Sequence, residues 1–326
     1  MSYSVSEETF DSLDSYWRDS SLNLNWSSVF VLPPWLRVWW QTFGTGDELY
    51  LRSLRQGKEL LGLAPLRIKG GTAYLVGSAD VCDYLDFITV PGKEASFCDA
   101  LISELDRGGI KQLNLESLRP ETTALRHLAD IARNRGYRVS SQPENVALEM
   151  ALPPTWEEYL ALLSRKQRHE TKRKLRRLEE AGQTIYHCRE SSQPVTTAMD
   201  TFLRLFRLSR KEKASFMTED KETFFRRLAE ETAKNDLLQF GTLEFDGTPV
   251  AMIMGFDYKD AFYLYNSGYD PRYKRFSIGL LSKLLCIRES INRGKKIWDF
   301  LKGGETYKYQ LGSREVSIYH CQITKS

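Results

Sequence analysis

Hydrophobic and polar positions alternate in short runs through the second half of the chain, which is typical of half-buried strands. These runs occupy residues 237–245, 248–257, 261–270 and 295–303. The first two are separated by Asp246-Gly247, a dipeptide that favours a tight β-hairpin. Between the last two runs, apolar residues recur at helical spacing over 277–294, and Gly294 ends that pattern. The second half is therefore predicted to form three strands, a helix and a strand.

The first half of the chain repeats this order of elements. Its strand-like runs occupy residues 48–55, 59–68, 72–77, 83–90 and 110–118, with a helix-like stretch over 95–109. Gly57 of the first hairpin aligns with Gly247, and the helix exit at Arg107 aligns with Arg293, a repeat of about 190 residues. Chance likeness of short patterns is the ordinary alternative. A period of this length is too long for a solenoid, so it indicates two similar α/β domains.

A boundary between the domains is predicted at residue 153. Pro153-Pro154 ends a strand, and Thr155 can cap the next helix with Glu158 three positions on. We therefore expect an N-terminal domain at 1–153 and a C-terminal domain at 154–326. Each should hold a mixed, mostly antiparallel sheet flanked by helices, because the hairpins require antiparallel pairs while the strand-helix-strand passage returns a parallel neighbour.

The segment Arg165–Arg177 concentrates positive charge, with eight Lys or Arg, one His and one acid in thirteen residues. If Arg165–Ala181 is one helix, Thr171, Leu175 and Leu178 form a stripe that can pack, and the cations cover a separate face. Like charges one turn apart destabilise an isolated helix by roughly 0.2–0.5 kcal/mol per pair, a cost that an anionic partner offsets. A solvated helix face is the alternative to a surface for phosphate, RNA or lipid.

Bulk composition limits the classes of protein that fit. Forty-six basic and forty-three acidic residues give a net charge of only +3, which argues against a chromatin-like DNA-binding protein. The five cysteines are odd in number and never in a C-x-x-C pair, and no Cys/His spacing suggests zinc, so we expect buried thiols and no metal. Without a signal peptide or a long apolar run, the expected location is cytoplasmic, and peripheral membrane contact stays open.

A second candidate phosphate site lies between the strand ending near residue 270 and the next helix. Ser277 is expected to cap that helix, Gly279 to let a ligand approach the backbone, and the helix N-terminus to hold phosphate oxygens. An ordinary capped helix is the alternative.

At these residues the chain resembles the Gcn5-related N-acetyltransferase (GNAT) superfamily, in the CelD/BcsL-like subgroup near polysaccharide biosynthesis that shares the Fem-type tandem fold. Lys274-x-x-Ser277-x-Gly279 is similar to the superfamily's coenzyme A loop, with Lys in place of Arg and Ser in place of the first Gly. The subgroup resemblance rests on residues 64–68, 83–87, 163–182, 265–281 and 298–313. It implies central parallel strands that splay apart around the donor, a donor-binding second domain and an acceptor cleft involving the first.

The resemblance and the charge pattern together give the expected donor-binding residues. These are Lys274, Arg275, Ser277, Ile278 and Gly279 in the loop, with Arg165, Arg168 and Lys172 on the basic helix. Where Fem-type enzymes recognise their acceptor, this chain has Asp83, Tyr84 and Asp86, which are the expected acceptor-binding residues. Trp35, Trp39 and Trp40 could line a sugar cleft, although their helical spacing favours core packing.

Four residues around Gly303-Gly304 are candidates for the chemistry of acyl transfer. Asp299 and Glu305 could accept the ammonium proton, and Tyr307 could return one to a departing thiolate. Lys308 resembles the lysine of the Fem-type F-K-x-x-F-G motif, matched here with Tyr307 and Leu311 in place of both phenylalanines, and the resemblance implies a role in stabilising charge. Direct attack needs no protein nucleophile, so Cys286 is interpreted as core.

The leading hypothesis is an acyltransferase that moves an acyl group from an acyl-CoA or acyl-carrier-protein thioester to an amine of a sugar, peptide or small metabolite. A Fem-like aminoacyltransferase that uses charged tRNA is the first alternative, because the coenzyme A loop is degraded and the basic helix is long. A non-catalytic GNAT-fold binding protein is the second. The acceptor, the acyl length and the oligomeric state cannot be derived from one sequence.

Overall fold

The computed structural model describes residues 3–189 and 194–325 and divides into two compact units. The first comprises Met1–Val146 with Val316–Ser326, and the second comprises Ala147–Glu315. The predicted boundary at residue 153 thus lies near the observed division, but the C-terminal segment belongs to the first unit. The reason is β13 (Arg314–Thr324), whose residues Tyr319–Thr324 pair antiparallel with β6 (Gln112–Leu118).

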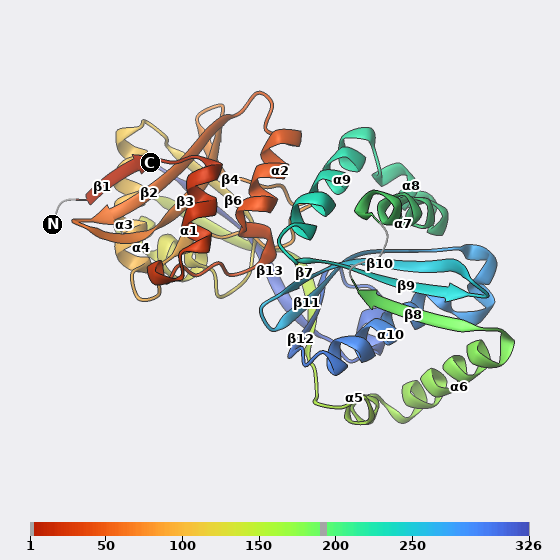
Figure 1. Cartoon of the computed structure of the whole chain (residues 1–326). Helices are drawn as coiled ribbons and strands as arrows, with labels where there is room; N and C mark the ends of the chain where they lie inside the picture. The colour runs from red at the N-terminus through yellow and green to blue at the C-terminus, as the bar shows by residue number, and fades with distance from the viewer. Residues whose placement is uncertain (1–2, 190–193, 326) are drawn as a thin grey trace. The chain divides into compact units, whose positions relative to one another are not determined.

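The first unit is built on a mixed sheet in the order β1-β2-β3-β4-β6-β13 (Figure 1). Its remaining strands are β1 (Tyr3–Glu7), β2 (Glu48–Gln56), β3 (Glu59–Lys69), β4 (Thr72–Leu75) and the short β5 (Ile88–Thr89), which pairs with β3. Its helices are α1 (Phe10–Arg18), α2 (Pro33–Phe43), α3 (Glu94–Arg107) and α4 (Ala129–Asn134), with shorter turns at Ser20–Leu22, Val29–Val31 and Ala124–Leu128. Trp35 and Trp39 are buried, which confirms their core role.

The second unit repeats the plan with the sheet order β7-β12-β11-β10-β9-β8. Its strands are the end of β7 (Arg138–Ala151), β8 (Thr184–Arg189), β9 (Leu238–Phe245), β10 (Thr248–Tyr258), β11 (Ala261–Tyr269) and β12 (Ile297–Lys302). Its helices are α5 (Trp156–Leu162), α6 (Arg165–Ala181), α7 (Val195–Ser209), α8 (Lys211–Phe216), α9 (Glu219–Ala233), η4 (Pro271–Phe276), α10 (Ile278–Asn292) and α11 (Thr306–Gln310). Helices α7 and α10 pack on opposite faces of the strands β10 and β11 (Figure 1).

Local sequence chemistry accounts for the key turns. Asp246 and Gly247 have φ of 48° and 72°, the left-handed pair that a two-residue hairpin requires, so the predicted hairpin is confirmed. The predicted helix Arg165–Ala181 is also confirmed, with Ser164 and Gln167 forming a capping box. Leu178 of its packing stripe is 1% exposed.

Both units contain one parallel strand pair that is hydrogen-bonded only at its start. In the first unit, β4 and β6 pair at Thr72 and Ala73. In the second, β11 and β12 pair from Ala261 to Tyr263 and then separate. The sequence prediction of mixed sheets with a parallel pair after each helix is therefore confirmed.

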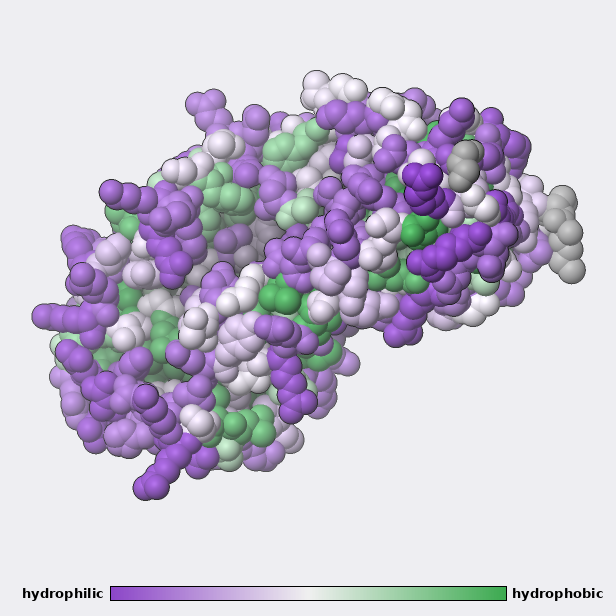
Figure 2. All heavy atoms as spheres, turned by 180° about the vertical axis from the view of Figure 1, so that it is seen from behind, coloured by the Kyte–Doolittle hydropathy of each residue, from purple (hydrophilic) through white to green (hydrophobic). Residues whose placement is uncertain are grey.

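The face of the molecule in Figure 2 is mostly hydrophilic, and hydrophobic side chains reach its surface in scattered patches. All five cysteines are free and buried. Among the described residues, no helix combines the length and hydropathy that a bilayer crossing requires. Within the same residues, no group of three or more His, Cys, Asp or Glu side chains is placed to hold a metal ion.

Candidate active site

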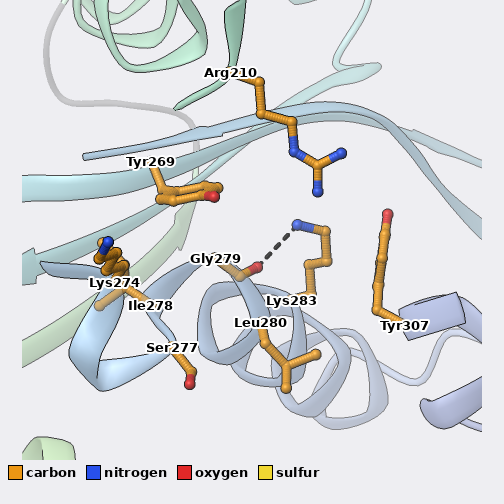
Figure 3. Close-up of a pocket in the computed structure, with 9 residues that line it drawn as sticks. All are labelled: Arg210, Tyr269, Lys274, Ser277, Ile278, Gly279, Leu280, Lys283 and Tyr307. Carbon is orange, nitrogen blue, oxygen red and sulfur yellow. Dashed lines mark hydrogen bonds between the residues drawn. The ribbon is translucent and has the colours of Figure 1, made fainter. Parts of the chain in front are cut away.

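A cavity of about 230 Å³ lies at the separated end of β11 and β12. It is lined by Arg210, Tyr269, Lys274, Ser277, Ile278, Gly279, Leu280, Lys283 and Tyr307 (Figure 3). Four of these residues, Lys274, Ser277, Ile278 and Gly279, were predicted to bind the donor, and Tyr307 was predicted to act in catalysis. The structure thus gathers five predicted site residues from three separate elements around one cavity.

The N-terminus of α10 supplies unpaired backbone donors to this cavity. Ser277 has φ of 58° and ψ of 35°, a left-handed conformation that turns the chain sharply from η4 into α10. Its hydroxyl makes no capping hydrogen bond within the described chain, contrary to the expectation of a side-chain cap. The N–H groups of Ile278 and Gly279 likewise have no acceptor among residues 3–189 and 194–325. Such groups at a helix N-terminus favour an anionic ligand.

The lack of a side chain at Gly279 is needed for contact with Tyr269, and the expected close approach of a ligand to this backbone stays a prediction. A Cβ at this position would lie 2.8 Å from Cδ1 of Tyr269, whose ring stands against the helix at the end of β11. Figure 3 shows the Tyr269 ring above the first turn of α10. The missing side chain therefore lets an aromatic wall of the cavity pack directly on the helix.

Lys283 is the charged residue at the inner side of the cavity. It is 6% exposed, and its Nζ donates to Ser267 Oγ at 3.0 Å and to Gly279 O at 2.9 Å. In Figure 3 this Nζ points toward the guanidinium of Arg210. Burial, and then repulsion from Lys213 and Arg210, lowers the pKa of Lys283 to about 7. A lysine in this setting exchanges its proton near neutral pH.

Lys213, on α8, contacts the same strand as Lys283, which is β11. Its Nζ donates to the backbone oxygen of Ser267, so two lysine side chains hydrogen-bond to one serine. Burial and the charge of Arg210 lower the pKa of Lys213 to about 8. Neither lysine, nor Arg210, has a carboxylate within ion-pair distance among the described residues. Arg210 and Lys283 line the inner side of the cavity, and Lys213 lies next to them outside its lining, so positive charge is concentrated there.

Tyr307 forms the opposite wall. The first turn of α11 carries it, and its ring lies 5.1 Å from Nζ of Lys283. Burial, together with the charge of Glu305, raises the pKa of Tyr307 well above its usual value. The phenol consequently keeps its proton at neutral pH and can donate it to a group in the cavity.

The other predicted catalytic residues stabilise the turn between β12 and α11 and do not line the cavity. Lys308 is 2% exposed, and its Nζ donates to the backbone oxygens of Lys302 at 2.8 Å and Gly303 at 2.9 Å. It also pairs with Glu305 at 2.9 Å. Burial opposes ionisation of Glu305, but the hydrogen bond and charge of Lys308 outweigh it, so the pKa of Glu305 is lowered. Direct catalysis by either residue stays a prediction.

Asp299 has a comparable place within β12. It is 2% exposed, and its Oδ1 accepts a hydrogen bond of 2.7 Å from the N–H of Leu301. Leu301 has φ of 61°, so this carboxylate supports a left-handed residue in the irregular stretch between Asp299 and Lys302, where the pairing of β12 with β7 shifts register. Arg275, in turn, is exposed, and its guanidinium lies 4.7 Å from the ring of Phe276, outside the cavity lining.

A separate shallow groove of about 690 Å³ runs along the start of α6. It is lined by Arg165, Lys166, Arg168, His169, Glu170 and Lys172, which include the three predicted donor-binding residues of the basic helix. Arg168 donates to the backbone oxygens of Ala161 at 3.1 Å and Leu163 at 3.2 Å. The buried Nε of Arg168 has no hydrogen-bond partner in the described chain. The groove and the cavity at α10 share no lining residue.

In the first unit, the corresponding separation between β4 and β6 is filled by the protein itself. The N–H of Leu85 donates to Ser117 O of β6 at 3.0 Å, and the Leu85 side chain lies 2.8 Å from the place where Gly77 would carry a Cβ. The segment around Leu85 thus occupies the space that stays open beside α10.

The predicted acceptor residues belong to this filling segment. Asp86 is 6% exposed and accepts hydrogen bonds from the N–H groups of Thr123 at 2.9 Å and Ala124 at 3.4 Å. Burial raises the pKa of Asp86 to about 7, against the lowering effect of those bonds. Tyr84 is buried beneath the guanidinium of Arg119 at 4.8 Å, and Asp83 is half-buried. Their role in acceptor binding stays a prediction.

The sequence analysis missed Arg210, Lys213, Tyr269 and Lys283. A signal for Lys283 was present, because it is the lysine four residues after Gly279 in a helix whose neighbouring positions Leu281, Leu284 and Leu285 are apolar. A charge among such positions is buried and has a specific partner or function. No comparable pattern marks Arg210, which reaches the cavity from the turn between α7 and α8.

The fold and the position of the cavity are those of proteins with tandem GNAT-like domains. Comparison with known proteins supports this class. Residues 165–309 match the family model described as an acetyltransferase (GNAT) domain. This stretch contains all the lining residues of both cavities. No curated protein matches the chain.

Solved structures show the fold over nearly the whole chain. FemX superposes with a TM-score of 0.65 at 11% identity, covering 97% of this chain and 96% of FemX. A conserved protein of unknown function from Bacteroides thetaiotaomicron gives 0.59 at 11% identity, covering 98% and 99%. A tandem GNAT protein from the clavulanic acid biosynthesis pathway gives 0.51 at 12% identity, covering 98% of each chain. These likenesses establish a tandem GNAT fold, and the match to the acetyltransferase domain model supports an acyltransferase-type function.

Proposed function

We propose that this protein is an acyltransferase that moves an acyl group from an acyl-CoA or acyl-carrier thioester to an amine of a sugar, peptide or small metabolite. The observation that carries the proposal is the cavity at the separated end of β11 and β12, which has the free N–H groups of Ile278 and Gly279 at one side and Tyr307 at the other. A sugar amine would agree with the resemblance to the CelD/BcsL-like subgroup.

The donor side of this proposal rests on anion binding. The N–H groups of Ile278 and Gly279 and the side chain of Lys274 are placed to hold phosphate oxygens of a carrier, since the N-terminus of α10 adds a partial positive charge. The aromatic ring of Tyr269 shields this end of the cavity from one side. These groups fit a phosphate-bearing thioester and need no metal ion.

The chemical step is direct attack. The amine nitrogen forms a bond to the thioester carbonyl carbon, and the carbon–sulfur bond of the resulting tetrahedral intermediate breaks. The thiolate then takes the phenolic proton of Tyr307, and the proton lost by the amine returns to Tyr307 through solvent. Lys308, Glu305 and Asp299 act as positioning residues, because they fix the turn that carries Tyr307 and the bend of β12.

The proposal is tested by binding and turnover measured separately. Acetyl-CoA should bind the wild-type protein in calorimetry, and Lys274→Glu should weaken this binding about tenfold or more, since it replaces an attraction with a repulsion. Lys296→Glu is the matched control, because Lys296 is exposed and lies outside the cavity. Absence of binding and of transfer to every member of an amine panel would refute the proposal.

Tyr307→Phe tests the chemical step. It should retain acetyl-CoA binding and lose about a hundredfold in turnover, the scale of a positioned acid. If Tyr307→Phe turns over at the wild-type rate, Tyr307 is not the proton donor. The binding site for the acyl donor is tested separately, by the effect of Lys274→Glu on acetyl-CoA binding.

A second candidate function, aminoacyl transfer from charged tRNA, is favoured by the cationic groove on α6 and by the likeness to FemX. A tRNA that contacts Arg165, Arg168 and Lys172 would release several counterions, so its affinity should fall steeply with salt. Filter binding of charged tRNA at increasing salt measures this slope, and Lys172→Gln should make it shallower. No measurable tRNA affinity at low salt would exclude this candidate. If neither donor class gives turnover, a non-catalytic binding protein becomes the better reading.

A further inference from the structure

We propose that Arg210, Lys213 and Lys283 form a carboxylate-binding subsite, the cationic trio, so that one substrate of this transferase carries a carboxylate into the gap between β11 and β12. This inference rests on the proposed function and specifies the substrate class of the same site. A neutral acyl group and a neutral amine would leave these three charges without a role.

The first argument is the convergence of the trio on one strand position. Lys283 donates to the side chain of Ser267 at 3.0 Å, and Lys213 donates to the backbone oxygen of the same residue. The guanidinium of Arg210 lies above Nζ of Lys283 (Figure 3). Three side chains from α8, α10 and the turn before α8 therefore place like charges together beside β11.

The second argument is that this charge is not neutralised. Among the described residues, the charged or titratable groups that line the cavity with the trio or act on Lys283 are the cations Lys274 and Lys308, the phenols of Tyr269 and Tyr307, and the carboxylate of Glu305. Glu305 is already paired with Lys308 at 2.9 Å. Buried like charges repel strongly where solvent is excluded, so a bound anion removes an existing electrostatic penalty.

The third argument separates the trio from the phosphate-binding end. The free N–H groups belong to the first two residues of α10, whereas Lys283 lies one turn further along the helix and Ser267 lies two residues before the end of β11. A donor whose phosphates lie at the helix N-terminus therefore extends its acyl end toward the trio. An acyl group with a terminal carboxylate, or an amine with an adjacent carboxylate, presents the complementary charge there.

Protonation of the trio gives the subsite a pH dependence. The pKa values of Lys283 and Lys213 are about 7 and about 8, so both are charged below neutral pH and both lose charge as the pH rises. Carboxylate affinity should therefore be highest near pH 6 and fall through pH 7 to 9. Bound carboxylate raises both pKa values in return, by linkage.

A small-molecule probe tests the subsite without reference to any reaction. Succinate should raise the melting temperature of the full-length protein at pH 6.5 and do so less at pH 9, while uncharged succinamide should have no effect. Lys283→Met should abolish the response to succinate, and Lys296→Met, at an exposed residue outside the cavity, should retain it. Equal responses to succinate and succinamide, or an undiminished response in Lys283→Met, would overturn the proposal.

A second experiment identifies which substrate carries the carboxylate. If the acyl group carries it, succinyl-CoA should bind about tenfold or more tightly than butyryl-CoA, which has the same chain length without the charge, and Lys283→Met should remove the difference. If the amine carries it, an amino acid should be preferred to its amide as acceptor by a similar factor. If the wild-type protein shows neither preference, the subsite is refuted even if acyl transfer occurs. Conversely, a protein that binds succinate through Lys283 but no thioester would retain the subsite and refute the proposed function.

Discussion

Replacing Lys283 by methionine gives a quantitative test of the electrostatics at the site. Burial and neighbouring cations lower the pKa of Lys283 from 10.5 to about 7. One pKa unit corresponds to ~1.4 kcal/mol, so charging this amine disfavours the folded state by ~5 kcal/mol relative to the unfolded chain. Methionine has a similar length and carries no charge, so Lys283→Met removes this contribution and retains most of the packing.

The sign of the effect follows from proton linkage. Between pH 7 and pH 10 the unfolded chain binds more protons at this lysine than the folded protein, so wild-type stability rises with pH across that window, and below it the full penalty is present. The variant loses two hydrogen bonds, to Ser267 and Gly279, at a cost of ~1–2 kcal/mol at every pH. We therefore expect Lys283→Met to be more stable than wild type by ~3 kcal/mol at pH 6, and less stable by no more than ~1 kcal/mol at pH 10, where part of the wild-type penalty remains.

Urea denaturation at a series of pH values measures both free energies of unfolding, with intrinsic tryptophan fluorescence as the signal. Buffers without phosphate or carboxylate are needed, since either anion would neutralise the trio. Lys213 titrates in the same window and is present in both proteins, so the difference between them reports the charge on Lys283 together with its repulsion of Lys213. Parallel stability curves from pH 6 to pH 10 would refute the assignment of an uncompensated charge at this position.

Three further substitutions have defined outcomes. Gly279→Ala should destabilise the protein by ~1–3 kcal/mol, because its Cβ would lie 2.8 Å from the Tyr269 ring, and an unchanged urea midpoint would contradict this contact. Lys308→Met should cost ~2–4 kcal/mol, because several buried backbone oxygens lose their donor, and a loss below ~0.5 kcal/mol would argue against the structural role. The raised pKa of Asp86, about 7, means that its contribution to stability is present at low pH and is lost as pH rises from about 4 through 7. Asp86→Asn should remove this decline in melting temperature while keeping the acceptor for Thr123, and identical pH profiles would contradict it.

Much of the architecture could be predicted because local signals agree with the fold. The Asp246-Gly247 hairpin, the helix from Arg165 to Ala181 and the repeated order of strands all follow from turn chemistry, capping and periodicity. The sequence could not predict that the C-terminal strand β13 joins the sheet of the first unit. This strand pairs with β6 through backbone hydrogen bonds between residues some two hundred positions apart. Such pairing leaves no local signature.

The candidate site was predictable only where backbone conformation determines it. The turn at Ser277 and Gly279 is visible in the sequence, whereas the direction of a side chain after a strand is not. Lys308 illustrates the difference, because its place in a recognisable motif suggested the reaction centre, yet its Nζ faces the backbone oxygens of its own turn. Lys283 illustrates the converse. Nothing in its sequence context was taken to indicate a site residue, although its burial in an apolar helix is what lowers the pKa of its amine.

The segment around Leu85 has a consequence for how the duplicated architecture is used. Because the protein's own chain occupies the space between β4 and β6 and is held there by internal contacts such as Thr123 to Asp86, the proposed carrier site beside α10 has no counterpart at this position of the first unit. Saturation should therefore occur at one thioester for each polypeptide. The two units thus share one plan but differ at this position, which forms a cavity beside α10 and is occupied by the chain itself between β4 and β6.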